Sequence, residues 1–139
     1  MQRTPGWEKI YIANTCSQIG PRATRLLDAE FIHTRRAQRA GENGRAVIGW
    51  FGADGPKHAA MAVSYRSLVP KRGENILAAG RCLGAPDSVD TFRLICPCFV
   101  TGQAAGTVAA LCAKKGLSPR RLPYSDLRSA LEKTNVFLG

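Results

Sequence analysis

The sequence has few acidic residues, few aromatic residues and no long apolar run. Ten Asp and Glu residues accompany 20 Lys and Arg residues, giving a net charge of +10, and aromatic residues make up only 7% of the chain. An excess of positive charge indicates a polyanionic partner, such as nucleic acid. The basic residues are scattered, however, and lack the interleaved aromatic side chains on which bases stack. A solvated basic surface is therefore favoured, and nucleic acid is an unlikely partner.

The sequence also has no segment with the composition of a membrane-spanning helix or a secretory signal. No segment approaches the roughly 20 apolar residues that a bilayer-spanning helix needs, and the N-terminal sequence has no apolar stretch of signal-peptide length. These absences predict a soluble, cytoplasmic protein without a membrane partner. A chain of 139 residues, 45% of them apolar, can form one domain or part of a larger one and can bury a core.

The five cysteines are odd in number, which argues against a disulfide framework. Cys96 and Cys98 are separated by one residue, closer than the usual zinc ligand pair, and only His33 and His58 could add imidazole. We therefore predict small buried thiols and no metal site.

Apolar patterns predict a mixture of strands and helices. Strands are expected at 8–14, 26–34, 60–67 and 76–79. The last of these is wholly apolar, which is typical of a sheet covered on both faces. The range 46–51 is expected to enter the core, and 35–45 is expected to form a short helix followed by a loop.

Two helices are expected near the C-terminus. The first is predicted from about Thr101, as its N-cap, to Lys115, with Gly116 ending it. The second is predicted to begin near Ser125, and the apolar tail 136–138 is expected to pack back onto the fold.

A helix that begins at Thr101 would present unpaired amides beside Gly102, where the missing side chain lets a ligand approach. The same helix has many small residues on one side, which also suits close packing on a sheet. The residues alone leave a ligand site and simple packing as alternatives.

Several motifs occur in a fixed order along the chain. They are QIGPRATR at 18–25, YRSLVP at 65–70, NILAAGRC at 75–82, CFVTGQAAGTVAA at 98–110 and VFL at 136–138. Together they resemble the C-terminal segment of the FAD-dependent oxidoreductase family, which belongs to the two-domain flavoproteins. The resemblance covers most of the chain, and the combination is more specific than any single motif.

The resemblance implies an α/β fold that is the C-terminal segment of a partial FAD/NAD(P)-binding Rossmann-like fold. Residues 61–139 would be the C-terminal part of the FAD-binding domain, and residues 1–60 a remnant of the substrate-domain edge and a connecting segment. The implied cofactor is FAD. The residues implied to bind it are Gly80, Arg81, Gly102, Gln103 and Ala104.

The resemblance also implies roles for charged residues. Arg22 and Arg25 would bind an anionic small-molecule substrate, and Arg93 and His58 would be catalytic. Surface ion pairs for the arginines, and an exposed loop position for the histidine, are the alternatives.

The chain departs from the family pattern in two places. The loop at 85–88 reads APDS where the family carries a His-Glu pair, and the proline expected soon after Arg93 is displaced to Pro97. These changes bring the acid–base chemistry into question.

No Gly-x-Gly-x-x-Gly occurs in the sequence, so the N-terminal dinucleotide-binding βαβ unit is lacking. A separate N-terminal FAD-binding half, or a second copy of this chain, is therefore the expected partner.

Three functional hypotheses follow. In the first, the chain is the C-terminal portion of an FAD-dependent oxidoreductase that transfers hydride and is inactive alone. In the second, it is a non-catalytic or regulatory subunit that kept this piece of the fold. In the third, it is a basic nucleic-acid-binding domain.

Overall fold

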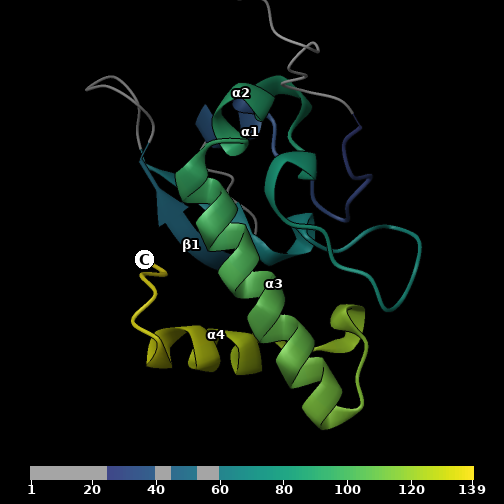
Figure 1. Cartoon of the computed structure of the whole chain (residues 1–139). Coiled ribbons are helices and arrows are strands. Elements are labelled where there is room, and N and C mark those ends of the chain that lie inside the picture. Colours follow the sequence, from purple (N-terminus) through teal and green to yellow (C-terminus); the bar gives the residue numbers. More distant parts are fainter. Residues whose placement is uncertain (1–24, 40–44, 53–59) are drawn as a thin grey trace, which may run out of the picture.

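The structure is a computed structural model that describes residues 25–39, 45–52 and 60–139. Its helices and strands are α1 (Arg35–Arg39), β1 (Val47–Phe51), β2 (Met61–Ser64), α2 (Val89–Phe92), α3 (Ile95–Lys115) and α4 (Tyr124–Lys133) (Figure 1). Four single 3₁₀ turns connect them: η1 (Tyr65–Ser67), η2 (Gly80–Cys82), η3 (Pro86–Ser88) and η4 (Pro119–Arg121). The mixture of helices and a small sheet is compatible with an α/β fragment. The predicted strand at 8–14 lies outside the described residues.

The sheet is an antiparallel pair in which Val47 lies opposite Ser64 and Phe51 opposite Met61. Its register is irregular between Val47 and Gly49. A side chain at Gly49 would come within 2.7 Å of a methyl group of Val100. Glycine at this position therefore lets α3 cross close over β1.

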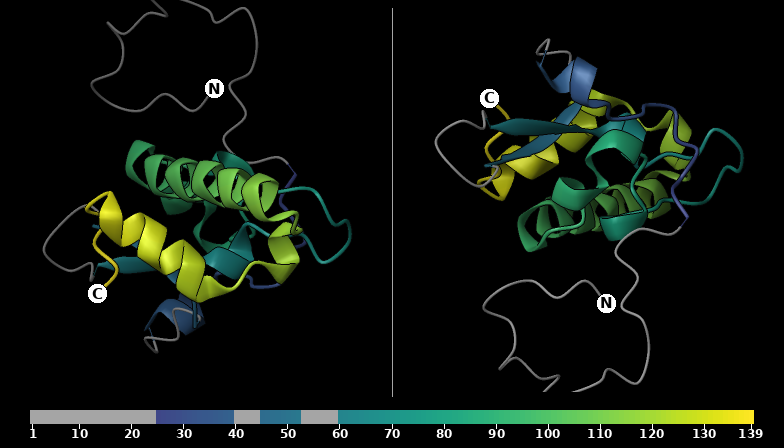
Figure 2. Two further views of the ribbon diagram at one scale, coloured as in Figure 1. Left: turned by 90° about the horizontal axis from the view of Figure 1, so that it is seen from below. Right: turned by 90° about the horizontal axis from the view of Figure 1, so that it is seen from above.

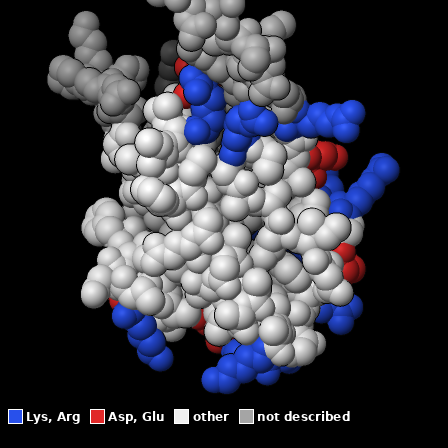
Figure 3. Space-filling model, viewed as in Figure 1, with Lys and Arg blue, Asp and Glu red and all other residues white. Residues whose placement is uncertain are grey.

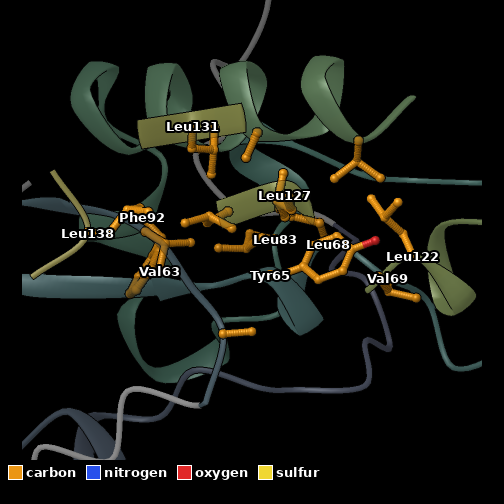
Figure 4. Close-up of a cluster of buried hydrophobic side chains, with 14 of the residues drawn as sticks. Val63, Tyr65, Leu68, Val69, Leu83, Phe92, Leu122, Leu127, Leu131 and Leu138 are labelled. Carbon is orange, nitrogen blue, oxygen red and sulfur yellow. The ribbon is translucent and has the colours of Figure 1, made fainter. Parts of the chain in front are cut away.

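The core lies between the sheet, α3 and α4. Figure 2 shows the sheet and α4 on the same side of α3, so only one face of this long helix is covered by described elements. Figure 4 shows Leu127 and Leu131 of α4 gathered with Val63 of β2 and with Leu83, which follows η2. All four side chains are at most 1% exposed, so the core joins elements that lie far apart in the sequence.

The two sides of α3 differ in exposure. Its buried residues recur at helical spacing and form its inner face: Pro97, Thr101, Ala104, Val108 and Cys112. The exposed residues opposite them are almost all apolar or small and are called the outer face: Ile95, Phe99, Gly102, Gly106, Ala109, Ala110 and Ala113. Figure 3 shows this side of the molecule as mostly uncharged, with Lys and Arg side chains toward its margins.

The predicted strand at 26–34 is wrong, because this segment forms only an isolated bridge between Ala29 and Pro70. Its backbone bonds go to loops instead of a neighbouring strand. The amide of Leu27 donates to the carbonyl of Cys82 at 2.7 Å, and that of His33 donates to Gly84 at 2.8 Å.

The predicted strand at 60–67 is confirmed only for β2. It ends at Ser64, whose hydroxyl accepts a hydrogen bond from the amide of Arg66 and caps η1. The strand predicted at 76–79 does not form. Within the described residues the segment is not paired with another strand, and Ile76 is 58% exposed.

The short helix predicted within 35–45 is confirmed by α1, and 46–51 enters the core as expected. The tail prediction is confirmed for Val136 and Leu138, which pack against the core, and wrong for Phe137, which is 72% exposed.

The first C-terminal helix was predicted with the correct end and the wrong beginning. It ends at Gly116, whose φ of 63° is the left-handed conformation that favours glycine. It begins at Ile95 rather than Thr101, because Pro97 lies in the first turn, where a missing amide costs no helical hydrogen bond. The second helix begins at Tyr124, next to the predicted residue.

Among residues 25–39, 45–52 and 60–139, α3 is the helix that is long and apolar enough to cross a membrane, with a mean hydropathy of 1.5. This corrects the expectation that no segment approaches that composition. A helix inside a domain meets the same criterion, and the inner face of α3 packs on the sheet, so the finding assigns no membrane.

Candidate functional site

The N-terminus of α3, called the α3 mouth, has amides without partners. Its N-cap residue Leu94 makes no side-chain hydrogen bond to the helix, and the first backbone bond into it runs from the amide of Cys98 to the carbonyl of Leu94 at 3.1 Å. Pro97 has no amide hydrogen. Within the described part of the chain, the amides of Ile95 and Cys96 are therefore left without an acceptor.

The α3 mouth is also electropositive. A helix of this length carries a partial positive charge at its N-terminus, and no acidic residue lies in the first turn of α3 to offset it. Arg93, partly buried, stands two residues before the helix. The mouth therefore suits an anion or the electron-rich edge of a ligand.

The η2 turn is fixed beside α3. The amide of Gly80 donates to the Thr101 hydroxyl at 3.0 Å, and this hydroxyl in turn donates to the carbonyl of Pro97 at 2.8 Å. Gly80 has a φ of 78°, which a residue with a side chain adopts at a cost. Because Leu27 bonds to Cys82 at the end of the same turn, three distant segments meet here.

The structure places three of the predicted cofactor residues, Gly102, Gln103 and Ala104, inside α3 rather than at its N-terminus. Gly102 does not open a helix but lies inside α3, where amides donate to the carbonyl four residues earlier. Ala104 is 0% exposed and faces the core. The exposed side chain of Gln103 donates to the hydroxyl of Thr134 at 3.3 Å, which ties it to the end of α4. The available amides are thus those of the α3 mouth.

The remaining predicted residues are placed only in part. Gly80 and Arg81 form η2, close to the mouth. Arg25 is exposed and lies two residues before the segment that bonds to η2. Arg22 and His58 lie outside the described residues. The cofactor, substrate and catalytic roles of all these residues stay predictions.

A groove with a volume of about 790 Å³ runs along the flank of α3. Its walls come from the helix, from the loop after Pro70 and from the turn after α3. The residues that line it include Asn75, Leu77, Ala105, Gly106, Ala109 and Ala113. A side chain built on Gly106 would meet nothing within 4 Å, so packing within the described chain does not require glycine at this position.

The YRSLVP motif has a structural role that sequence reasoning missed. Arg66 pairs with Glu30 at 3.0 Å, and Arg120 pairs with the other oxygen of the same carboxylate. Arg120 also donates to the carbonyl of Pro70 at 2.6 Å. We call Glu30, Arg66 and Arg120 the polar clamp. The polar clamp joins segments that are far apart in the sequence. The YRSLVP motif, which contains Arg66, is the feature of the sequence that could have indicated it.

Tyr65 adds to this connection. Its hydroxyl donates to the carbonyl of Pro119 in η4, and burial raises the pKa of Tyr65 to about 12. The tyrosine is therefore a neutral hydrogen-bond donor at physiological pH.

His33 was considered only as a metal ligand, and the structure shows a different role. Its Nε2 atom accepts the amide hydrogen of Ser64 at 3.3 Å, and its ring stacks on Phe92 with centroids 4.6 Å apart. It is 1% exposed, and burial lowers its pKa to about 4. His33 is therefore neutral at pH 7 and holds a loop against β2.

The cysteines are not all buried thiols. Cys112 is buried, and burial raises the pKa of its thiol, but Cys82 and Cys96 are exposed and Cys98 is half-buried. In the portion of the chain that the structure describes, no group of three or more His, Cys, Asp or Glu residues could hold a metal ion.

Comparison with known proteins identifies the family. Residues 32–131, well over half of the chain, match the family model described as FAD dependent oxidoreductase. No curated protein and no solved structure matches the chain. The matched range contains Arg66 and Arg120 of the polar clamp, η2 and all of α3. The chain therefore belongs to the FAD-dependent oxidoreductase family.

Proposed function

We propose that this chain is the C-terminal portion of an FAD-dependent oxidoreductase and supplies the flavin-ring side of its cofactor site. The reaction would be hydride transfer to or from a small molecule, in the cytoplasm. The observation that carries the proposal is the uncapped α3 mouth, held beside η2 by the bond between Gly80 and Thr101.

The residues present fit the ring of FAD. A flavin ring has apolar faces and an edge that gains electron density on reduction. The mouth offers free amides, and Ile95 and Phe99 beside it are 72% and 73% exposed, which gives apolar surface for contact. Gly102, one turn further along the helix, has open space where a side chain would be.

The sequence lacks the motif that binds the adenosine diphosphate half of FAD. The Gly-x-Gly-x-x-Gly turn that holds its pyrophosphate is absent from the sequence. Under the proposal, residues 61–139 are the C-terminal part of the Rossmann-like FAD domain, and residues 1–60 come from the edge of the substrate domain. The pyrophosphate is held by a unit outside these 139 residues.

The roles of the chain's own residues follow from their positions. FAD, when bound, supplies the atom that exchanges hydride with the substrate. The amides of Ile95 and Cys96 would stabilise negative charge on the ring edge without rearranging, because the helix fixes them in place. Arg93 would add a positive charge nearby. Arg22 and Arg25 would orient an anionic substrate, and His58 would hold or move a proton.

The test is the visible absorption of the purified chain with FAD, alone and together with a separately expressed dinucleotide-binding half of a family member. We expect little FAD binding by the chain alone and a yellow complex with both parts. Cys96→Pro, which removes one mouth amide in a position that tolerates proline, should weaken FAD binding by the complex about tenfold. Cys96→Ser keeps the amide and should not. Equal FAD affinity for the two variants would contradict a role for the mouth.

A non-catalytic subunit is the second candidate, supported by the missing fingerprint and by the altered loop at 85–88. It predicts a complex that forms but stays colourless. A nucleic-acid role has only the net charge in its support, and it predicts binding that falls steeply with salt.

A further inference from the structure

Thr101 lies inside α3, and its hydroxyl makes hydrogen bonds in two directions. The hydroxyl donates to the carbonyl of Pro97 at 2.8 Å, and its oxygen also lies 3.2 Å from the carbonyl oxygen of Cys98. The same oxygen accepts the amide hydrogen of Gly80, which lies 21 residues earlier in the sequence, at 3.0 Å. Thr101 is 1% exposed, so one buried group bonds both to the first turn of α3 and to η2.

Thr107 shows which part of this arrangement any threonine in a helix can make. Its hydroxyl donates to the carbonyl of Gln103, four residues earlier, at 2.9 Å. Thr101 makes the same backward bond to Pro97, which is a common way for a helical threonine to use its proton. Within the described residues, no other segment bonds to the hydroxyl of Thr107. The bond from Gly80 is therefore what distinguishes Thr101.

The placement of η2 depends on this bond. Gly80 opens η2 with a φ of 78°, and a side chain at this position would lie 3.7 Å from Sγ of Cys98. The turn therefore lies close against α3, with its first amide directed at the helix. Without the hydroxyl of Thr101, this amide would lose its acceptor, and η2 would lose a bond that orients it on α3.

The hydroxyl also bonds to the part of α3 that carries the mouth. Pro97 and Cys98 belong to the first turn of the helix, which begins with the free amides of Ile95 and Cys96. Thr101 therefore fixes η2 relative to these amides. Binding groups that are held in position bind a ligand more tightly, because less ordering is needed when the ligand arrives.

We propose that Thr101 is a positioning residue for the flavin ring. Its hydroxyl fixes η2 relative to the α3 mouth, and because the side chain is buried it does so without touching the cofactor. The inference rests on the proposed function, since it concerns the same site. It goes further by assigning the spacing of the two parts of that site to one hydroxyl, on a residue that the sequence predicted to be a helix cap.

The experiment measures FAD affinity in the complex of the full chain with a separately expressed dinucleotide-binding half of a family member. Thr101→Val keeps the shape of the side chain and removes the hydroxyl, so it should weaken FAD binding about tenfold. Thr101→Ser keeps the hydroxyl and should bind within about twofold of the wild type. Thr107→Val is the matched control, because it removes only the backward bond, and it should bind FAD normally.

A second measurement needs no FAD. Hydrogen exchange at the amide of Gly80 is followed in the chain alone, and Thr101→Val should accelerate it by about tenfold or more. Thr101→Ser and Thr107→Val should leave it unchanged. Thermal unfolding of each variant is measured in parallel. If Thr101→Val does not fold, Thr101→Ala removes the same hydroxyl and replaces it with a residue that favours the helix.

The outcomes separate this inference from the proposed function. A yellow wild-type complex with equal FAD affinity for Thr101→Val and Thr101→Ser overturns the inference and keeps the proposed function. Unchanged exchange at Gly80 in Thr101→Val overturns it as well, and so does an equal loss of FAD affinity in Thr107→Val. A wild-type complex that forms but stays colourless contradicts the proposed function, and the role of Thr101 toward FAD with it.

Discussion

The inner and outer faces of α3 are built from similar small and apolar residues, but they have opposite surroundings. Val108 and Ala104 on the inner face are 0% exposed and pack with the sheet and α4. Phe99 and Ile95 on the outer face are more than 70% exposed. Apolar residues are thus distributed around α3 as they are on a helix buried from all sides.

The same contrast holds for polar groups. Behind the inner face, the hydroxyl of Tyr65 and Nε2 of His33 are buried and have partners, and among the described residues only Nε1 of Trp50 is a buried polar side-chain atom without one. At the α3 mouth and at Ile76 and Leu77, backbone groups have no partner among the described residues. The region behind the inner face is therefore packed and bonded within the described chain. The outer face and the α3 mouth are left open to a ligand or partner.

The largest expected effect compares one phenylalanine from each region. Phe92→Ala should lower the free energy of unfolding by about 3–5 kcal/mol, because Phe92 is 2% exposed and packs on His33 and Phe51. Phe99→Ala, at 73% exposure, should change it by about 0.5 kcal/mol or less. Urea denaturation of both variants checks the contrast. Equal losses would mean that the outer face is covered within the chain itself.

The pH dependence of stability tests the packing around His33, which belongs to the buried region behind the inner face of α3. Its pKa is about 4 in the fold and 6.5 in the unfolded chain, so the unfolded state binds a proton first. The stabilisation is present above pH 6.5 and is lost as the pH falls toward 4, by up to about 3 kcal/mol. His33→Gln offers a neutral acceptor and should lose this part of the pH dependence. Identical profiles for the two proteins would remove His33 as the cause.

The polar clamp should matter less than the core and more than a surface ion pair. Glu30→Gln is expected to cost about 1–2 kcal/mol, because the carboxylate is 22% exposed and bonds two arginines. The control Asp90→Asn breaks a pair with Arg35 in which both side chains are more than half exposed, and it should cost about 0.5 kcal/mol or less. Thermal unfolding at low and high salt measures both, and equal costs would contradict a structural role for the clamp.

The smallest expected effect comes from glycine-to-alanine substitutions, which should change the free energy of unfolding in opposite directions in the two regions. Gly106→Ala should stabilise the isolated chain by up to about 1 kcal/mol, because the added methyl group meets nothing and alanine favours the helix. Gly84→Ala should destabilise it by about 1 kcal/mol or more, because the methyl group would lie 2.9 Å from the carbonyl of Leu27. Loss of stability in Gly106→Ala would show that the groove is closed in solution.

Sequence reasoning succeeded where local chemistry decides the outcome. The end of α3 follows from Gly116 and the lysines before it, and α4 follows from the spacing of Leu127 and Leu131. It failed at the start of α3, which lies at Ile95, because a proline such as Pro97 suits the first helical turn and does not mark a boundary after it. Thr101 was taken as a cap, but its hydroxyl bonds within the helix and to Gly80.

The strand at 76–79 could not be judged from the sequence, because strand formation depends on a neighbour. The segment has the right residues and an extended end, and the described chain provides no strand to pair with it. The family was identifiable from the order of its motifs. The free amides were expected beside Gly102 and lie at Ile95 and Cys96 instead, because the helix begins earlier than predicted. The cofactor role of this region stays a prediction.

The visible absorption spectrum of the chain mixed with FAD and a dinucleotide-binding half decides whether the open region completes a flavin site. The account predicts flavin absorption that remains with the complex through gel filtration for the wild type and for Cys96→Ser, and that is reduced for Cys96→Pro. A complex that elutes colourless for the wild type, with all FAD in the free fraction, would contradict it.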